Sequence, residues 1–124
     1  MSVAYQRRSQ IVESLVAEAK AASARGEVSK AWALLANAHV ISQPVAWPHT
    51  VVHWKMLSLA VRTHNLKEIL GQLFRLFAAA PGSVLKKYPK GNPGTSDVSA
   101  FQAMPVSMEV QSIIDRIDDP DART

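Results

Sequence analysis

The sequence predicts an all-α protein in which four main helices form two antiparallel hairpins, followed by an irregular arm and a short fifth helix. Three observations lead to this fold class. Apolar residues recur at three- and four-residue steps through four successive segments. Glycine, proline or asparagine stands at each break between these segments. The chain has 124 residues, of which 48% are hydrophobic and 19% charged, a balance typical of one folded domain.

The first two helices are expected on either side of Gly26. The first spans residues 6–25, because its apolar stripe is free of glycine and proline. The second begins at Val28 and ends at Gln43-Pro44. Its expected inward positions are Val28, Ala31, Trp32, Leu34, Leu35, Ala38 and Ile41.

The third and fourth helices are expected on either side of His64-Asn65. The third starts near Pro48, because a helix leaves the first N–H groups unpaired and proline has none. The fourth runs from Leu66 to Ala80 and is closed by Pro81-Gly82. Six apolar residues of this helix are expected to face the core: Ile69, Leu70, Leu73, Phe74, Leu76 and Phe77. Three polar residues are expected to face solvent: Glu68, Gln72 and Arg75.

The C-terminal part changes in character and sets the domain organisation. We expect one helical domain over residues 1–124, made of a helical body (1–81), an irregular arm (82–106) and a short helix (107–118). The arm is rich in lysine, proline, glycine and serine, and Ser107 can cap the last helix. Four spaced apolar residues are expected to anchor the arm: Tyr88, Val98, Phe101 and Met104.

The segment Gly26-x-Val28-x-x-Ala31-x-x-x-Leu35-x-x-Ala38 is similar to the turn and second helix of a tetratricopeptide repeat, in which small residues let two helices pack closely. A weaker echo of the spacing follows Asn65, with large residues in place of small ones. An ordinary helical bundle also needs small residues where two helices cross. The pattern therefore predicts either tetratricopeptide-like hairpins or a simple bundle.

The charge and the termini limit the possible partners. Fourteen lysines and arginines against ten aspartates and glutamates give a formal net charge of +4. Because the excess never gathers into a basic run with interleaved aromatic residues, nucleic acid is not an expected partner. The first ten residues are polar, and no segment has the roughly 20 apolar residues that cross a bilayer. The expected location is the cytoplasm, with no membrane partner.

Three histidines form the candidate site. His49 and His53 are four residues apart near the start of the third helix, a spacing that lets two imidazoles bind one ion. His39 lies near the end of the second helix, and the connection to the third is short. The two helices are therefore expected to be antiparallel, which brings His39 toward the other two. His64, at the opposite end of its helix, is expected to be exposed and uninvolved.

The chemistry of this site follows from the absence of cysteine, which excludes thiolate ligands and disulfides. Three imidazoles suit zinc, copper, nickel or cobalt, with a fourth position for water, a carboxylate or Met56. The tryptophans are candidates for the wall of a pocket: Trp32, Trp47 and Trp54. The alternative is that the histidines are structural, because His39 follows Leu35 by four residues and falls on the buried face.

Four motifs stand out along the chain: Ala38-His39-Val40, Gln43-Pro44, Pro48-His49-x-x-Val52-His53-Trp54-x-Met56-Leu57 and Gly91-Asn92-x-Gly94-x-x-x-Val98-Ser99-x-Phe101-x-x-Met104-Pro105. Through these motifs, most of the chain resembles a small bacterial family of unknown function, DUF3703. The resemblance implies a bacterial, one-domain protein and no particular activity. His39, His49 and His53 all fall inside these motifs, whereas His64 falls outside them.

Two functions follow. The first is a cytoplasmic metal-binding or metal-sensing accessory protein that uses His39, His49 and His53. The second is a tetratricopeptide-like interaction module with structural histidines, whose partner is another protein or a second copy of the chain. An enzyme is not favoured, because the sequence places no nucleophile beside a base and identifies no catalytic residue.

Overall fold

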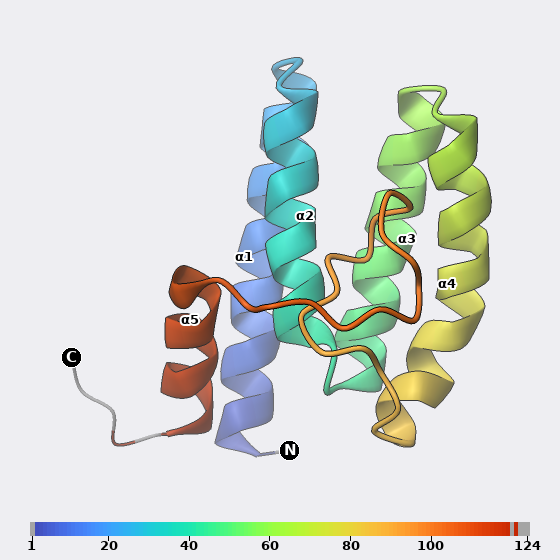
Figure 1. Cartoon of the computed structure of the whole chain (residues 1–124). Helices are drawn as coiled ribbons and strands as arrows, with labels where there is room; N and C mark the ends of the chain where they lie inside the picture. The colour runs from blue at the N-terminus through green and yellow to red at the C-terminus, as the bar shows by residue number, and fades with distance from the viewer. Residues whose placement is uncertain (1, 120, 122–124) are drawn as a thin grey trace.

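The computed structural model describes residues 2–119 and 121, and this part of the chain is helical without strands. α1 (Val3–Ala24) packs along α2 (Val28–Ser42), and α3 (Ala46–Arg62) packs along α4 (Leu66–Val84). The two hairpins stand side by side and are joined through α2 and α3 (Figure 1). α5 (Met108–Asp118) lies against α1 and α2. The predicted all-α fold, with four main helices and a short fifth, is confirmed.

The apolar core lies where α1, α2 and α3 meet, with α5 covering one side. Ala22, Ala31 and Ala38 are fully buried, and such small residues let α1 and α2 approach closely. Val52 and Met56 extend the same core along α3. No helix of the described residues is long and apolar enough to span a membrane.

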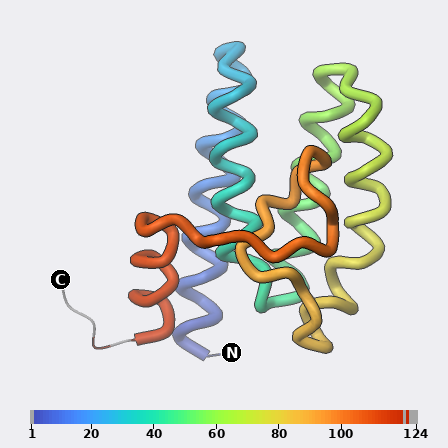
Figure 2. The backbone as a smooth tube through the Cα atoms, in the orientation of Figure 1, coloured from blue at the N-terminus to red at the C-terminus, as the bar shows by residue number. Residues whose placement is uncertain are grey.

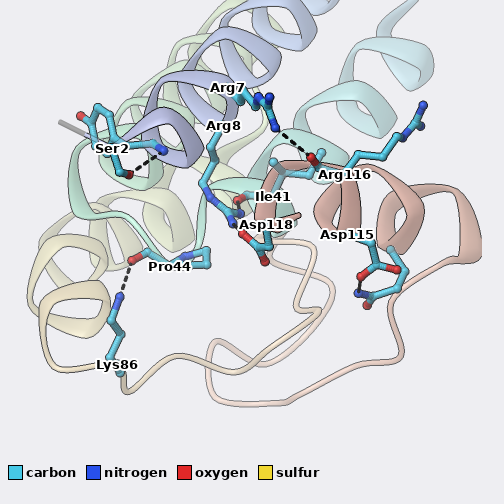
Figure 3. Close-up of polar contacts among 11 residues, drawn as sticks. Ser2, Arg7, Arg8, Ile41, Pro44, Lys86, Asp115, Arg116 and Asp118 are labelled. Carbon is cyan, nitrogen blue, oxygen red and sulfur yellow. Dashed lines mark hydrogen bonds and ion pairs between the residues drawn. The ribbon is translucent and has the colours of Figure 1, made fainter. Parts of the chain in front are cut away.

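Arg8 of α1 ties α5 to the helical body, although no sequence pattern singled it out. Its guanidinium donates to the carbonyl of Ile41 at the end of α2 and to Oδ1 of Asp118, the latter at 2.9 Å (Figure 3). Ser107 accepts a hydrogen bond from the backbone N–H of Val110, so its predicted role as the N-cap is confirmed. The two bonds of Arg8 therefore link α1 to the C-terminal ends of α2 and α5.

α4 ends later than expected. It continues through Pro81 to Val84, whereas Pro81-Gly82 was expected to close it at Ala80. Proline lacks an N–H but has a backbone angle φ compatible with a helix, so a last turn can follow it when other groups hold that turn. Here the side chain of Ser83 bonds to both His49 and the carbonyl of Gln43.

The face that α4 turns inward is the reverse of the expected one. Its buried residues are mostly polar: Glu68, Gln72, Arg75, Ala79 and Ser83. Ile69 and Leu76 are half-buried, and five other large apolar residues are exposed: Leu66, Leu70, Leu73, Phe74 and Phe77. We call the four polar members of the first set the polar stripe of α4, and the second set the apolar stripe of α4. The reversal has a physical reason, because the polar stripe finds hydrogen-bond partners in the histidines and in the arm.

The arm, residues 85–106, leaves α4, loops across the junction of the two hairpins and returns to α5 (Figure 2). The polar stripe of α4 holds it. Arg75 donates to the carbonyls of Thr95 and Val98, at 3.3 and 2.7 Å. Glu68 accepts from the backbone N–H of Ser96 at 2.7 Å.

The apolar anchors expected for the arm contribute less than these polar contacts. Phe101 is 79% exposed, and Tyr88, Val98 and Met104 are only half-buried. Asn92 is buried, as are the nearby Gly91 and Gly94, and its Nδ2 donates to the carbonyls of Ser99 and Gln102. The arm is therefore held as a hydrogen-bonded loop over the histidines.

Candidate metal centre

Two helices bring the three histidines together at the junction of the hairpins. His39 lies in the last turns of α2, and His49 and His53 lie in the first turns of α3. The short connection between the two helices makes their adjoining ends meet, as expected. All three side chains are buried, at 3%, 5% and 2% exposed. His64 is exposed in the turn between α3 and α4 and takes no part.

The Nε2 atoms of the three imidazoles form a small triangle. Nε2 of His39 is 3.0 Å from Nε2 of His53 and 3.0 Å from Nε2 of His49. The third side, between His49 and His53, is 3.2 Å. Each residue thus offers one ligand atom to the same point, which is the geometry that a three-histidine metal site requires.

Hydrogen bonds to the opposite ring atoms set the tautomer of His39 and His49. Nδ1 of His39 lies 2.6 Å from the carbonyl oxygen of Asn92, which can only accept, so Nδ1 donates. Nδ1 of His49 lies 2.8 Å from Oγ of Ser83. Because that hydroxyl gives its hydrogen to the carbonyl of Gln43, it must accept from His49. In both rings the proton is on Nδ1 and the lone pair is on Nε2.

His53 is held in the same tautomer through Gln72 of α4. Nδ1 of His53 donates to Oε1 of Gln72 at 2.7 Å. The amide cannot be reversed, since its Nε2 donates to the carbonyl of Gly94 at 2.8 Å and to Glu68 at 3.1 Å. Such partners on the far nitrogen orient histidine ligands in metal sites. The three lone pairs therefore converge.

Burial keeps the imidazoles neutral. It lowers the pKa of His39 well below its usual value, with smaller contributions from the neighbouring His53 and His49. Burial and the charge of His53 lower the pKa of His49 to about 3. Burial and the charge of Arg75 outweigh the hydrogen bond to Gln72 and lower the pKa of His53 to about 4. Neutral imidazole is the form that binds a metal ion.

Sequence reasoning identified the three histidines and missed the residues that orient them: Gln72, Ser83 and Asn92. The available signal was the polar stripe of α4, whose members lie on one helix face at spacings of four, three and eight residues over Glu68 to Ser83. Because the usual preference is to bury the apolar face of a helix, this polar face was expected to be exposed. Asn92 stands between Gly91 and Pro93 in a turn, and no local pattern indicates its burial.

A cavity of ≈ 100 Å³ lies against the three imidazoles. Its other walls come from α4 and the arm, and they include Phe74, Arg75, Tyr88 and Phe101. Trp32, Trp47 and Trp54 were expected to form the wall, but they do not line this cavity, and the last two are exposed. Met56 lies in the apolar core instead, so the fourth position of a metal ion would face the cavity.

The fold and the site define a class: small helical proteins with a buried three-histidine cluster at the junction of two hairpins. The chain belongs to the family described as protein of unknown function (DUF3703), which matches residues 6–114. The match includes the three histidines and the residues that orient them, and the predicted resemblance is confirmed. No curated protein and no solved structure matches the chain.

Proposed function

We propose that the protein is a cytoplasmic metal-binding accessory protein that holds one transition-metal ion on Nε2 of His39, His49 and His53. One observation carries this proposal: the three Nε2 atoms lie within 3.2 Å of one another while each Nδ1 donates its hydrogen elsewhere. Without a cation, three lone pairs face one another in a buried site, which is electrostatically unfavourable. A bound metal ion replaces this repulsion by three coordinate bonds.

The ligand set supports zinc, copper, nickel or cobalt, because these ions accept imidazole nitrogen. Magnesium and calcium prefer oxygen ligands and are not favoured. A zinc ion bound at about 2.0–2.1 Å with tetrahedral angles separates its nitrogen ligands by about 3.4 Å. The observed separations of 3.0–3.2 Å therefore need only a small outward movement of each ring.

The test is metal content and metal affinity of the untagged protein. We expect the chelator-stripped chain to bind one equivalent of one of these ions, and His49→Ala and His53→Ala each to weaken binding by about a hundredfold or more. His64→Ala is the matched control and should bind as the native chain does. Unchanged affinity and stoichiometry in His49→Ala would overturn the proposal. Loss of stability without any metal binding would make the histidines structural.

The apolar stripe of α4 favours a second candidate function, self-association, in which the partner is a second copy of this chain. Leu66, Leu70, Leu73 and Phe77 are spaced by four, three and four residues, the spacing of a seam between paired helices. A two-fold axis would let each stripe meet itself. At roughly 100 Å² per side chain, the five residues of the stripe offer on the order of 500 Å², somewhat below the ~800 Å² per partner of a standard interface.

Sedimentation equilibrium tests this second candidate. The native chain should dimerise, and Leu70→Ser combined with Phe77→Ser should weaken the dimer at least about tenfold. Met108→Ser is the matched control, because Met108 is 90% exposed and lies on α5. A native chain that sediments as a monomer at every concentration would exclude self-association. The tetratricopeptide-like interaction module that binds a different protein stays a prediction.

A further inference from the structure

A second cavity, of ≈ 330 Å³, lies between the two hairpins and is larger than the one beside the histidines. It is bounded by α1 on one side and α3 on the other, helices that belong to different hairpins (Figure 1), and Leu35 of α2 contributes to its lining. We call it the α1–α3 groove. Neither the three histidines nor the residues that orient them line this groove, so it is separate from the candidate metal centre.

The interior of the groove is apolar. Val16 and Val51, which line it from α1 and α3, are half-buried. Four further apolar residues of the lining are buried: Val12, Ala19, Leu35 and Leu59. Sites for small molecules usually have volumes of about 300–1,000 Å³ and mostly apolar walls, so the groove has the size and the lining of such a site. An apolar ligand would remove this surface from water, which is favourable.

The rim of the groove carries an excess of positive charge. Lys20, Lys55 and Arg62 are exposed at the rim, and Glu13 is the carboxylate among the lining residues. Three cations and one carboxylate leave two positive charges in excess. None of these three cations forms an ion pair with an acidic residue in the described part of the chain. The ligand that complements the groove is therefore apolar along its length and negatively charged.

The charges also differ between the two ends of the groove. α1 and α3 both run antiparallel to α2, so they run parallel to each other and end on the same side (Figure 1). Arg62 ends α3, and Lys20 and Ser23 lie in the last two turns of α1. Glu13 lies about two turns before Lys20. A negative group is thus favoured near Lys20 and Arg62 and disfavoured at the other end.

We propose that the α1–α3 groove binds a medium-chain fatty acid. Its carboxylate lies between Lys20 and Arg62, and its alkyl chain extends along Val16 toward Val12. The volume of ≈ 330 Å³ corresponds to about eleven groups of the size of a water molecule, at about 30 Å³ each. A methylene group is of similar size, so decanoate fills the groove. A bilayer lipid, which has two long acyl chains, exceeds this volume.

Calorimetric titration of the native chain with hexanoate, octanoate, decanoate and tetradecanoate tests the proposal. Each extension by two methylene groups up to decanoate should raise the affinity about tenfold, because each group buries a similar apolar area. Tetradecanoate should gain nothing further, because the groove is then full. Decanamide has the same chain and no charge, and it should bind about tenfold more weakly than decanoate or worse.

Ala17→Trp tests the place of binding. Ala17 is exposed and lines the groove, so an indole at this position occupies the space of the ligand with little effect on the core. We expect at least a tenfold loss of decanoate affinity. Ala21→Trp is the matched control, because Ala21 is exposed on the same helix and does not line the groove. It should bind decanoate as the native chain does.

Lys20→Gln combined with Arg62→Gln tests the place of the carboxylate, and it decides the question if Ala17→Trp does not fold. We expect decanoate to bind about tenfold more weakly to this variant and decanamide to bind as it does to the native chain. Lys67→Gln combined with Lys90→Gln is the matched control. It changes the net charge equally at exposed residues outside the groove and should have no effect.

Four outcomes would overturn the proposal. A native chain that shows no saturable binding of decanoate has no fatty-acid site, and equal affinity for decanamide excludes recognition of the anion. Native decanoate affinity in a folded Ala17→Trp variant places the ligand outside the groove. If decanoate does not bind and Ala17→Trp instead weakens self-association in sedimentation equilibrium, the occupant of the groove is a second copy of the chain.

Discussion

Acidification of the metal-free protein is expected to lower its stability steeply below about pH 6.5 and to unfold it before pH 4. The folded-state pKa values of His49 and His53 lie near 3 and 4, well below the ordinary value of 6.5. Between these values the unfolded chain takes up protons that the folded chain cannot accept, so stability is complete above about pH 6.5 and falls with pH. In this range each buried histidine lowers the free energy of unfolding by about 1.4 kcal/mol per pH unit. The total free energy of unfolding of a small domain is only about 5–15 kcal/mol.

Urea unfolding at a series of pH values measures this effect. The free energy of unfolding should be constant above pH 7. Near pH 5 it should fall with a slope that corresponds to the uptake of at least two protons on unfolding. His53→Gln should give a shallower slope, whereas the control His64→Gln should keep the native one. A free energy of unfolding that stays constant from pH 7 to pH 4.5 would contradict the burial of neutral imidazoles.

Gly94→Ala is expected to displace His39 from the histidine cluster, although it replaces none of the three histidines. A Cβ atom at Gly94 would lie 2.6 Å from Cδ2 and 2.9 Å from Nε2 of His39. The imidazole cannot move aside, because Nδ1 is bonded to Asn92 and Nε2 lies in the triangle. We expect metal affinity to fall about tenfold to a hundredfold, and stability to fall by about 1–3 kcal/mol.

Gly26→Ala is the matched control for this substitution. Gly26 and Gly94 have nearly the same left-handed backbone, with φ of +79° and +82°, so both variants carry the same backbone strain. Around Gly26, however, a Cβ atom would meet nothing within 4 Å. Gly26→Ala should therefore lose stability and keep its metal affinity. Equal metal affinity in the two variants would show that the arm does not hold His39 in position.

The histidine cluster was predictable because its causes are local. The spacing of His49 and His53 by four residues places them on one helix face, and the break at Gln43-Pro44 returns the chain toward His39. Both relations depend only on helical geometry and on a short connection. The same local logic predicted the helices and the cap at Ser107, since periodicity and capping act within one or two turns.

The orientation of α4 was not predictable in the same way. It carries a polar and an apolar stripe, and the usual preference for burying the apolar one points to the wrong face. Hydrogen bonding decides which face of α4 is buried. Gln72 and Ser83 gain hydrogen bonds to His53 and His49 only when the polar stripe faces inward. These partners lie on another helix, and no pattern within α4 indicates them.

On its own, the amino-acid sequence determined the helices, their order and the convergence of the three histidines, because short-range helix geometry governs all of these. Tertiary structure alone decided the tautomers, the neutral state of the imidazoles and the place of the arm. Each of these depends on groups far apart in the chain: the carbonyl of Asn92 is 53 residues from His39, and the hydroxyl of Ser83 is 34 from His49. Hydrogen-bond satisfaction in a buried site is a property of the whole packed chain, so it becomes visible only when the chain is folded.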